Sequence, residues 1–330
     1  MNKTAGFNDR IRAYSEYQPV RTPRIRAPGD PRTDDTVRFY DTIPWSASLE
    51  LIILDDRSYR DVRIRKLDTP GVAACDRTML GATQLAWFEQ ALLAAQKRGT
   101  AWKLVVISSP LQELGNAAQV GIDLDDSKAW VGNYRCERDR ILRFIDEHAI
   151  DNVVFITTDY HWTSVNNLFY HALPGDPSSP RKPARNAFEI ITGPLGAISG
   201  SPLRDRVPFA GLSLKDATTR VVGSINTSLA KAGLDPIGLE ADFPGLDIGS
   251  VRAYGQPAAP GDPAAFSAIA SYSYAVLTFD ASSVHVQVKA LPYVADPKTL
   301  ADAATLKEYE ARRATEAFSF TIRARAPLDI

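Results

Sequence analysis

Three short apolar runs alternate with two segments of helical periodicity, and this alternation constrains the fold more than any other feature of the sequence. The runs cover residues 49–54, 103–108 and 153–158, and a polar residue follows each of them. Apolar runs of four to eight residues are typical of buried strands. Residues 81–97 and 137–148 repeat apolar side chains at the period of a helix. Strands that alternate with helices in this way predict a parallel sheet covered by helices.

The remainder of the chain predicts a looser organisation around this half. Residues 1–47 contain five prolines that interrupt any periodicity, so we expect an irregular lead-in. Residues 200–265 are expected to be rich in loops, with short helical pieces. Further predicted elements are a strand at 187–192, a hairpin formed by strands at 271–280 and 284–291, a helix at 300–316 and an added strand at 318–322.

The composition is that of an ordinary globular protein, with 45% hydrophobic and 23% charged residues. A formal net charge of -1 argues against bulk binding of nucleic acid or electrostatic binding to a membrane surface. No apolar run approaches the ~18 residues of a membrane span, and the polar N-terminus lacks the core of a signal peptide. The localisation and the oligomeric state stay open.

The two cysteines, Cys75 and Cys136, are too few for a disulfide framework. One bridge and two free thiols are both compatible with the sequence. Two cysteines and four histidines also exclude a site of the zinc-ribbon type.

The third apolar run ends abruptly in Asp159-Tyr160-His161. Ligands of open α/β sheets lie beyond the carboxyl ends of the strands, so this carboxylate and this imidazole leave the sheet where chemistry usually occurs. Both groups are good ligands for hard or borderline metals. The alternative is structural, because an aspartate after a strand is also a common turn residue or helix cap.

Six short motifs follow one another along the chain. They are LDDRSYRD at 54–61, RTMLGATQ at 77–84, GNYRCER at 132–138, TDYH at 158–161, VNNL at 165–168 and TGPLG at 192–196. Taken in this order, they resemble the alkaline phosphatase D (PhoD-like) family of metallophosphatases over roughly residues 11–291. Asn133 and Thr158 stand where that family usually has glycine.

The resemblance implies a metallo-dependent phosphatase-like αββα sandwich that hydrolyses phosphate monoesters or diesters. It implies a cluster of divalent or trivalent metal ions, calcium and iron in the best-described type. Asp159 and His161 match the family's metal-ligand motif and are therefore expected to bind metal. The expected partner is a small phosphate ester. Full-length relatives are usually exported, although no signal peptide is visible in this chain.

Two N-terminal ligand motifs of the family, D-x-x-Y and W-D-D-H-E, are not found in the sequence. We therefore expect residues 1–330 to form a single domain that is incomplete at its N-terminus. It comprises the lead-in 1–47, a βαβαβ half at 48–200 and a loop-rich region with a hairpin at 200–330. The activity of such a chain is doubtful, and the alternative is a non-catalytic remnant that keeps the fold without a complete metal centre.

Two arginines near the expected strand ends are candidates for binding substrate. Arg57 and Arg138 could contact a phosphate group, because a guanidinium fork matches phosphate oxygens. The alternative, which we favour, is a structural ion pair with Asp55, Asp61 or Glu137.

The other histidines and two asparagines are weaker candidates. His171 could be a further metal ligand, whereas His148 is expected to cap a helix. His285 is expected to lie in a strand, either at the surface or as a packing residue. Asn166 and Asn167 could orient a ligand, although a helix cap is the interpretation that we prefer.

Overall fold

The structure is a computed structural model of the 330-residue chain. It describes residues 5–19, 21, 23–62, 75–112, 130, 134–159, 161–176, 178–195, 226–227, 247–252, 267–268, 271–292 and 302–325.

A seven-stranded sheet forms the centre of the described part of the chain. The three predicted strands lie next to one another in it and run parallel, which confirms the expected parallel sheet. A fourth parallel strand, β6, pairs with β4, and antiparallel strands complete both edges. In spatial order, the strands are β1 (Asp41–Ser46), β2 (Leu49–Ile53), β3 (Trp102–Val106), β4 (Val153–Thr157), β6 (Arg181–Ile191), β5 (Thr163–His171) and β8 (Ser267–Ala268).

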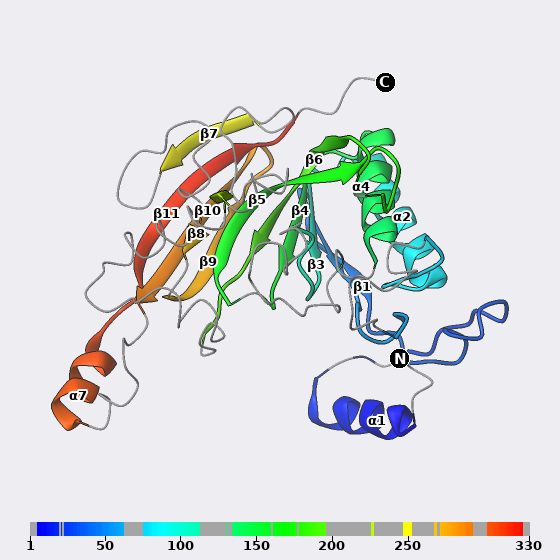
Figure 1. Ribbon diagram of the computed structural model, residues 1–330, viewed down its shortest axis with the longest axis horizontal. Helices are drawn as coiled ribbons and strands as arrows, with labels where there is room; N and C mark the ends of the chain where they lie inside the picture. Colours follow the sequence, from blue (N-terminus) through cyan, green and yellow to red (C-terminus); the bar gives the residue numbers. More distant parts are fainter. Residues whose placement is uncertain are drawn as a thin grey trace.

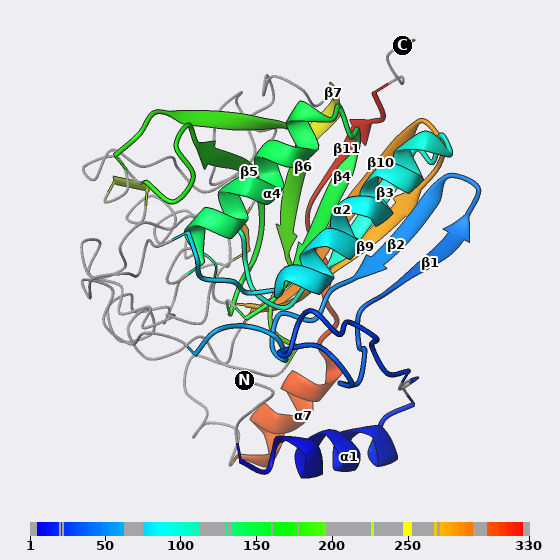
Figure 2. The same cartoon turned by 90° about the vertical axis from the view of Figure 1, so that its right-hand side faces the viewer.

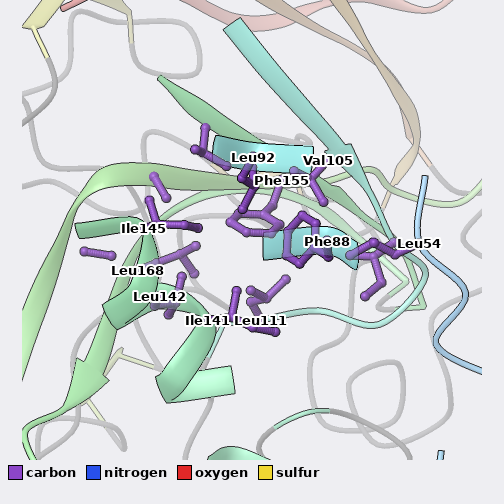
Figure 3. Packing of buried hydrophobic residues seen from close by; sticks show 14 of the residues in the cluster. Leu54, Phe88, Leu92, Val105, Leu111, Ile141, Leu142, Ile145, Phe155 and Leu168 are labelled. Atoms are coloured by element: carbon purple, nitrogen blue, oxygen red, sulfur yellow. The ribbon is translucent and has the colours of Figure 1, made fainter. Parts of the chain in front are cut away.

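The two predicted helices cover one face of this sheet, as Figure 2 shows. Helix α2 spans Ala82–Lys97 and helix α4 spans Arg135–Glu147. Phe88 from α2 and Leu142 from α4 are fully buried in one cluster with Phe155 of β4 (Figure 3). Burying side chains of this size stabilises a fold by about 1.5–3 kcal/mol each, so this cluster fixes the helices on the sheet.

A second sheet of four antiparallel strands packs on the other face (Figure 1). Its hairpin of β9 and β10 confirms the predicted hairpin, and β11 confirms the predicted additional strand. Its spatial order is β7 (Asp247–Arg252), β11 (Thr315–Arg323), β10 (Ser283–Pro292) and β9 (Ser271–Phe279).

The core between the two sheets comes from residues that alternate along their strands. Trp102, Val154 and Phe188 of the first sheet meet Val286 and Phe318 of the second, and all five are fully buried. The described residues therefore form helix, sheet and sheet layers in that order, three of the layers of an αββα sandwich. Helix α7 (Ala303–Ala311) extends from the end of the second sheet (Figure 1).

Several elements differ from the sequence-based expectations. The supposedly irregular lead-in contains helix α1 (Phe7–Tyr17) and strand β1. Asn166 and Asn167 lie inside strand β5, so the preferred helix-cap interpretation is wrong. The predicted helix at 300–316 is confirmed but shorter, and the loop-rich region at 200–265 lies mostly outside the described residues.

Among the described residues, no helix combines the length and the apolar character that crossing a membrane requires.

Candidate active site

The four parallel strands all end at one edge of the first sheet, and a polar residue lies one or two positions beyond each of them. Asp55 follows β2, Ser108 follows β3, Asp159 follows β4 and Thr192 follows β6. Backbone hydrogen bonds keep these ends in register, with Thr158 N donating to Ser108 O at 3.3 Å and Thr192 N to Thr157 O at 2.9 Å. The carboxyl ends of parallel strands are where ligands bind in open α/β sheets, which makes this edge the candidate site.

Asp159 and His161 lie at this edge, directly beyond β4, the middle strand of the seven. This position confirms where the sequence placed them in the fold. Asp159 has a φ of 75°, a left-handed conformation that aspartate tolerates better than most residues. Backbone strain of this kind costs roughly 1–3 kcal/mol and often occurs at functional sites. Both residues are half-buried, and their binding of a common metal stays a prediction.

Arg57 is held at the same edge by a buried carboxylate. Asp56 is 2% exposed, and Ser108 Oγ lies 2.7 Å from its Oδ1 and 2.9 Å from its Oδ2. Arg57 Nε donates to Ser108 Oγ at 3.1 Å and lies 3.5 Å from Asp56 Oδ1. The ion pair therefore involves Asp56, which was not among the expected partners. The Arg57 side chain is 40% exposed, so its guanidinium is both anchored and accessible.

Arg138 is placed differently, because its side chain is only 1% exposed. Its Nη1 donates to Asp139 Oδ1 at 2.8 Å and its Nε donates to Leu111 O at 2.6 Å. These bonds favour the structural alternative for Arg138, with Asp139 as partner. The preceding residue, Glu137, is also structural: its Oε1 accepts hydrogen bonds from Met79 N at 3.0 Å and Leu80 N at 2.9 Å.

His171 lies at the opposite end of the sheet from Asp159 and His161. Strand β5 runs antiparallel to β6, so it begins near the candidate site at Thr163 and leads away from it. Nine extended residues span roughly 27 Å, which is far beyond the reach of a shared metal ion. The expectations for the other two histidines are confirmed, because His148 ends helix α4 and His285 lies in β10.

Sequence reasoning missed Glu189, a fully buried carboxylate on β6. It accepts hydrogen bonds from Leu111 N at 2.6 Å, from Gln112 N at 2.9 Å and from Thr157 Oγ1 at 2.8 Å. Burial raises the pKa of this carboxyl, against the opposing effect of these donors. Glu189 thus anchors the loop after β3 that carries Ser108. The sequence feature that could have identified Glu189 is that it is the single charged residue within the apolar run at 187–191.

A model of the PhoD-like phosphatase family matches residues 6–230. This chain belongs to the PhoD-like phosphatase family. Among solved structures, the structure of PhoD is similar over 95% of this chain and 48% of its own, with 17% sequence identity and a TM-score of 0.51. The PhoD-like chain thus spans about half the length of that structure, and at this identity the likeness concerns the fold.

A second solved structure, the purple acid phosphatase PPD1 isolated from yellow lupin (Lupinus luteus) seeds, matches 86% of the PhoD-like chain and 32% of its own. The identity is 11% and the TM-score is 0.37. A comparison with curated proteins found no match.

PhoD-like phosphatases are metal-dependent, so the donors at the candidate site can be compared with what a metal centre needs. Asp159 and His161 offer a carboxylate and an imidazole, two donor types that metal ions take as ligands in proteins. Within the described ranges, no group of three or more histidine, cysteine, aspartate or glutamate side chains could hold a metal. The described residues therefore fit part of a metal site and do not form a two-ion centre.

Proposed function

We propose that this PhoD-like chain takes part in metal-dependent hydrolysis of phosphate monoesters or diesters, with Asp159 and His161 as metal ligands. The observation that carries the proposal is the left-handed conformation of Asp159 at the carboxyl end of the central strand. Backbone strain of this kind is concentrated at functional sites, where a side chain must face a ligand. Asp35, Ala149 and Asn152 also have a positive φ, and only Asp159 lies at the carboxyl end of the central strand. Family membership supports the same chemistry.

The residues at this edge have different roles in the proposed reaction. A bound metal ion supplies positive charge for the phosphate and lowers the pKa of a coordinated water. Asp159 and His161 hold the ion, and Arg57 contacts the phosphate oxygens. Asp56 and Ser108 fix the orientation of Arg57, because Ser108 Oγ accepts from Arg57 Nε while it donates to Asp56. A preoriented guanidinium loses less entropy when it binds an oxyanion.

Two donors hold one ion loosely, and we therefore propose that this chain has low activity. An in-line displacement between two ions needs them ~3.5–4 Å apart, with several ligands for each. The competing hypothesis is the non-catalytic remnant, which keeps the fold and binds no metal at this edge. The two hypotheses differ in metal binding, so that quantity separates them better than turnover does.

The test compares the wild-type chain with Asp159→Asn and His161→Gln. Asparagine also tolerates the left-handed conformation, so the first variant should keep its fold. We expect calorimetric titration with Ca²⁺ and Fe³⁺ to show binding in the wild type that both variants lose. His285→Gln removes a histidine from β10 of the second sheet and serves as the matched control. Hydrolysis of bis(p-nitrophenyl) phosphate is measured in parallel, with PhoD as the positive control.

Two outcomes would overturn the proposal. Folded wild-type protein that binds neither metal nor substrate would establish the remnant. Strong hydrolysis that a chelator abolishes but Asp159→Asn preserves would place the metal ligands elsewhere.

A separate kinetic measurement tests the proposed contact between Arg57 and phosphate. Arg57→Gln should raise KM for bis(p-nitrophenyl) phosphate about tenfold or more, because a charge-assisted hydrogen bond is lost. Metal binding should not change. A weakened affinity for metal without a change in KM would assign Arg57 to the support of the metal site instead.

We also propose that the chain functions in an oxidising compartment. Cys75 and Cys136, whose redox state the sequence left open, form a disulfide with a Cα–Cα distance of 5.2 Å. Disulfides persist in secreted and periplasmic proteins and are rare in the cytosol. Mass spectrometry of alkylated, unreduced protein from the native source tests this, because two alkylated thiols would contradict the assignment.

A further inference from the structure

A cavity of about 400 Å³ opens at the other end of the parallel strands. It lies where the C-terminus of α2, the segment before β4 and the turn between β9 and β10 come together (Figure 2). Its polar lining includes Lys103 from β3, Asp151 and Asn152 from the segment before β4, and Arg325 after β11. The cavity therefore joins both sheets at the edge that faces away from Asp159.

Lys103 is an unusual residue to find at such a position. Its side chain is on a core strand and the residue is only 1% exposed. The ammonium donates to Gln96 Oε1 and, at 3.0 Å, to the main-chain oxygen of Asp151. Both acceptors are neutral. Among the described residues, this buried ammonium therefore makes two hydrogen bonds with its three N–H groups and has no carboxylate within hydrogen-bond distance.

The balance of charge around the cavity is positive. Lys103 and Arg325 contribute two cations, and the carboxylate of Asp151 is the lining's only anion among the described residues. That carboxylate is itself engaged by Gln96 Nε2 at 3.2 Å. Arg325 is fixed from behind by its Nη1 hydrogen bond to Asn186 Oδ1 at 2.6 Å and by its backbone N–H to Asn152 Oδ1 at 2.9 Å. A negatively charged ligand would neutralise the excess charge.

The apolar residues and the volume of the cavity indicate which kind of molecule carries the negative charge. Ala101, Ala281 and Ala324 form an apolar part of the wall. A volume of this size falls in the range of sites for small molecules, and it exceeds what a bare inorganic ion fills. The lining thus suits a compact molecule that has both a carbon body and an oxyanion.

We propose that this cavity binds a small organic oxyanion, a carboxylate or a phosphate monoester, through Lys103 and Arg325. The site is separate from the candidate active site. Asn152 precedes β4 and Asp159 follows it, and this length of extended chain spans roughly 20 Å. Hydrolysis at the distant edge does not require this cavity, so the two proposals can fail independently.

Calorimetric titration with malate, glycerol 3-phosphate and inorganic phosphate tests the proposal, with glycerol as the neutral control. EDTA in every solution prevents binding of these anions to a metal at the other edge. We expect saturable binding of malate or glycerol 3-phosphate, tighter than that of inorganic phosphate. Comparison of malate with glycerol 3-phosphate distinguishes a carboxylate from a phosphate ligand. Trp102, whose indole N–H donates to Asp280 O at 2.8 Å next to the cavity, offers a fluorescence signal.

Lys103→Met removes the charge while it keeps a long apolar side chain, and we expect it to weaken binding about tenfold or more. Arg325→Gln should do the same and serves if Lys103→Met does not fold. Lys289→Met, a matched change on β10 away from the cavity, and Asp159→Asn should both bind as the wild type does. The proposal is overturned if none of the three anions binds saturably, or if binding survives unchanged in both cavity variants.

Discussion

Gly193 lies so close to Ser273 that a Cβ added to the glycine would sit 2.3 Å from Ser273 Oγ. The same atom would be 2.7 Å from the backbone nitrogen of Thr163. Gly193 N also donates to Thr163 Oγ1 at 2.6 Å, and Ser273 N donates to Pro194 O at 2.9 Å. The segment after β6 is thus held between the second sheet and the start of β5. The first residue of β5, Thr163, is two residues after His161 in the sequence.

Gly193→Ala should therefore destabilise the protein by about 2–3 kcal/mol, because the backbone of Thr163, as well as the hydroxyl groups of Thr163 and Ser273, must move to admit the methyl group. Urea denaturation measures this change. Gly29→Ala is the matched control, since an added Cβ there meets nothing within 4 Å, and we expect a change below about 0.5 kcal/mol. Equal stability of the two variants would show that the clamp around Gly193 is loose.

Glu137 should prove to be a structural anchor whose hydrogen bonds matter more than its charge. It is 4% exposed and receives hydrogen bonds from Thr78 Oγ1, Met79 N and Leu80 N. Burial raises the pKa of this carboxyl, so its charge is of little benefit to the folded state. Glu137→Ala leaves buried donors without an acceptor and should cost about 3 kcal/mol or more. Glu137→Gln keeps an acceptor and should cost less than half as much, which thermal or urea denaturation can measure.

Reduction of the Cys75–Cys136 disulfide should weaken the fold. The bridge closes a loop of 61 residues, for which the chain-entropy account predicts a loss of up to about 4 kcal/mol. Cys75→Ser should lose stability to a similar extent, and dithiothreitol should then have no further effect. If the wild type unfolds at the same urea concentration with and without reductant, the bridge contributes nothing.

The burial of Lys103 makes part of the stability dependent on pH. Burial lowers the pKa of this ammonium to about 8, although the nearby Asp151 carboxylate opposes the shift. Between about pH 8 and the ordinary value near 10.4, the unfolded chain binds more protons at this position than the folded chain does. The contribution of Lys103 to the free energy of unfolding therefore rises with pH across that window, by up to about 3 kcal/mol.

Comparison with Lys103→Met isolates this contribution from other groups that titrate in the same range. The stability of the variant relative to the wild type should be highest below pH 8 and should fall as the pH approaches 10. Urea denaturation at several pH values provides the measurement. A difference that does not change with pH would mean that the Lys103 pKa is close to normal.

Much of the first sheet could be predicted because the burial of a strand or a helix determines the pattern of apolar residues in its own sequence. A strand covered on both faces is apolar at nearly every position, and a helix on a sheet repeats its apolar residues every three or four positions. The runs ending at Leu54, Ser108 and Thr158 show the strand pattern, and the helices between them show the helical repeat. The end of the third run also located Asp159 and His161, since the residue after a buried strand must leave the sheet.

Strand β5 escaped prediction because several of its buried residues are polar. Asn166 is fully buried, and its Nδ2 donates to Ser164 Oγ at 3.0 Å and lies 3.5 Å from Glu189 Oε2. A buried amide of this kind interrupts the apolar pattern without interrupting the strand. The reversal of direction in β5 also explains why His171, ten residues from His161 in sequence, lies at the opposite edge.

The pairing of Arg57 with Asp56 and Ser108 shows the limit of local reasoning. Ser108 is 52 residues from Asp56 along the chain, and the two meet because β2 and β3 run parallel in register. The cavity beside Lys103 arises in the same way, from segments of both sheets. Periodicity records which face of an element is buried, whereas the hydrogen-bond partners of a buried polar group depend on which strands become neighbours. Neighbouring strands are chosen by the packing of the whole domain, so these contacts are visible only in the folded structure.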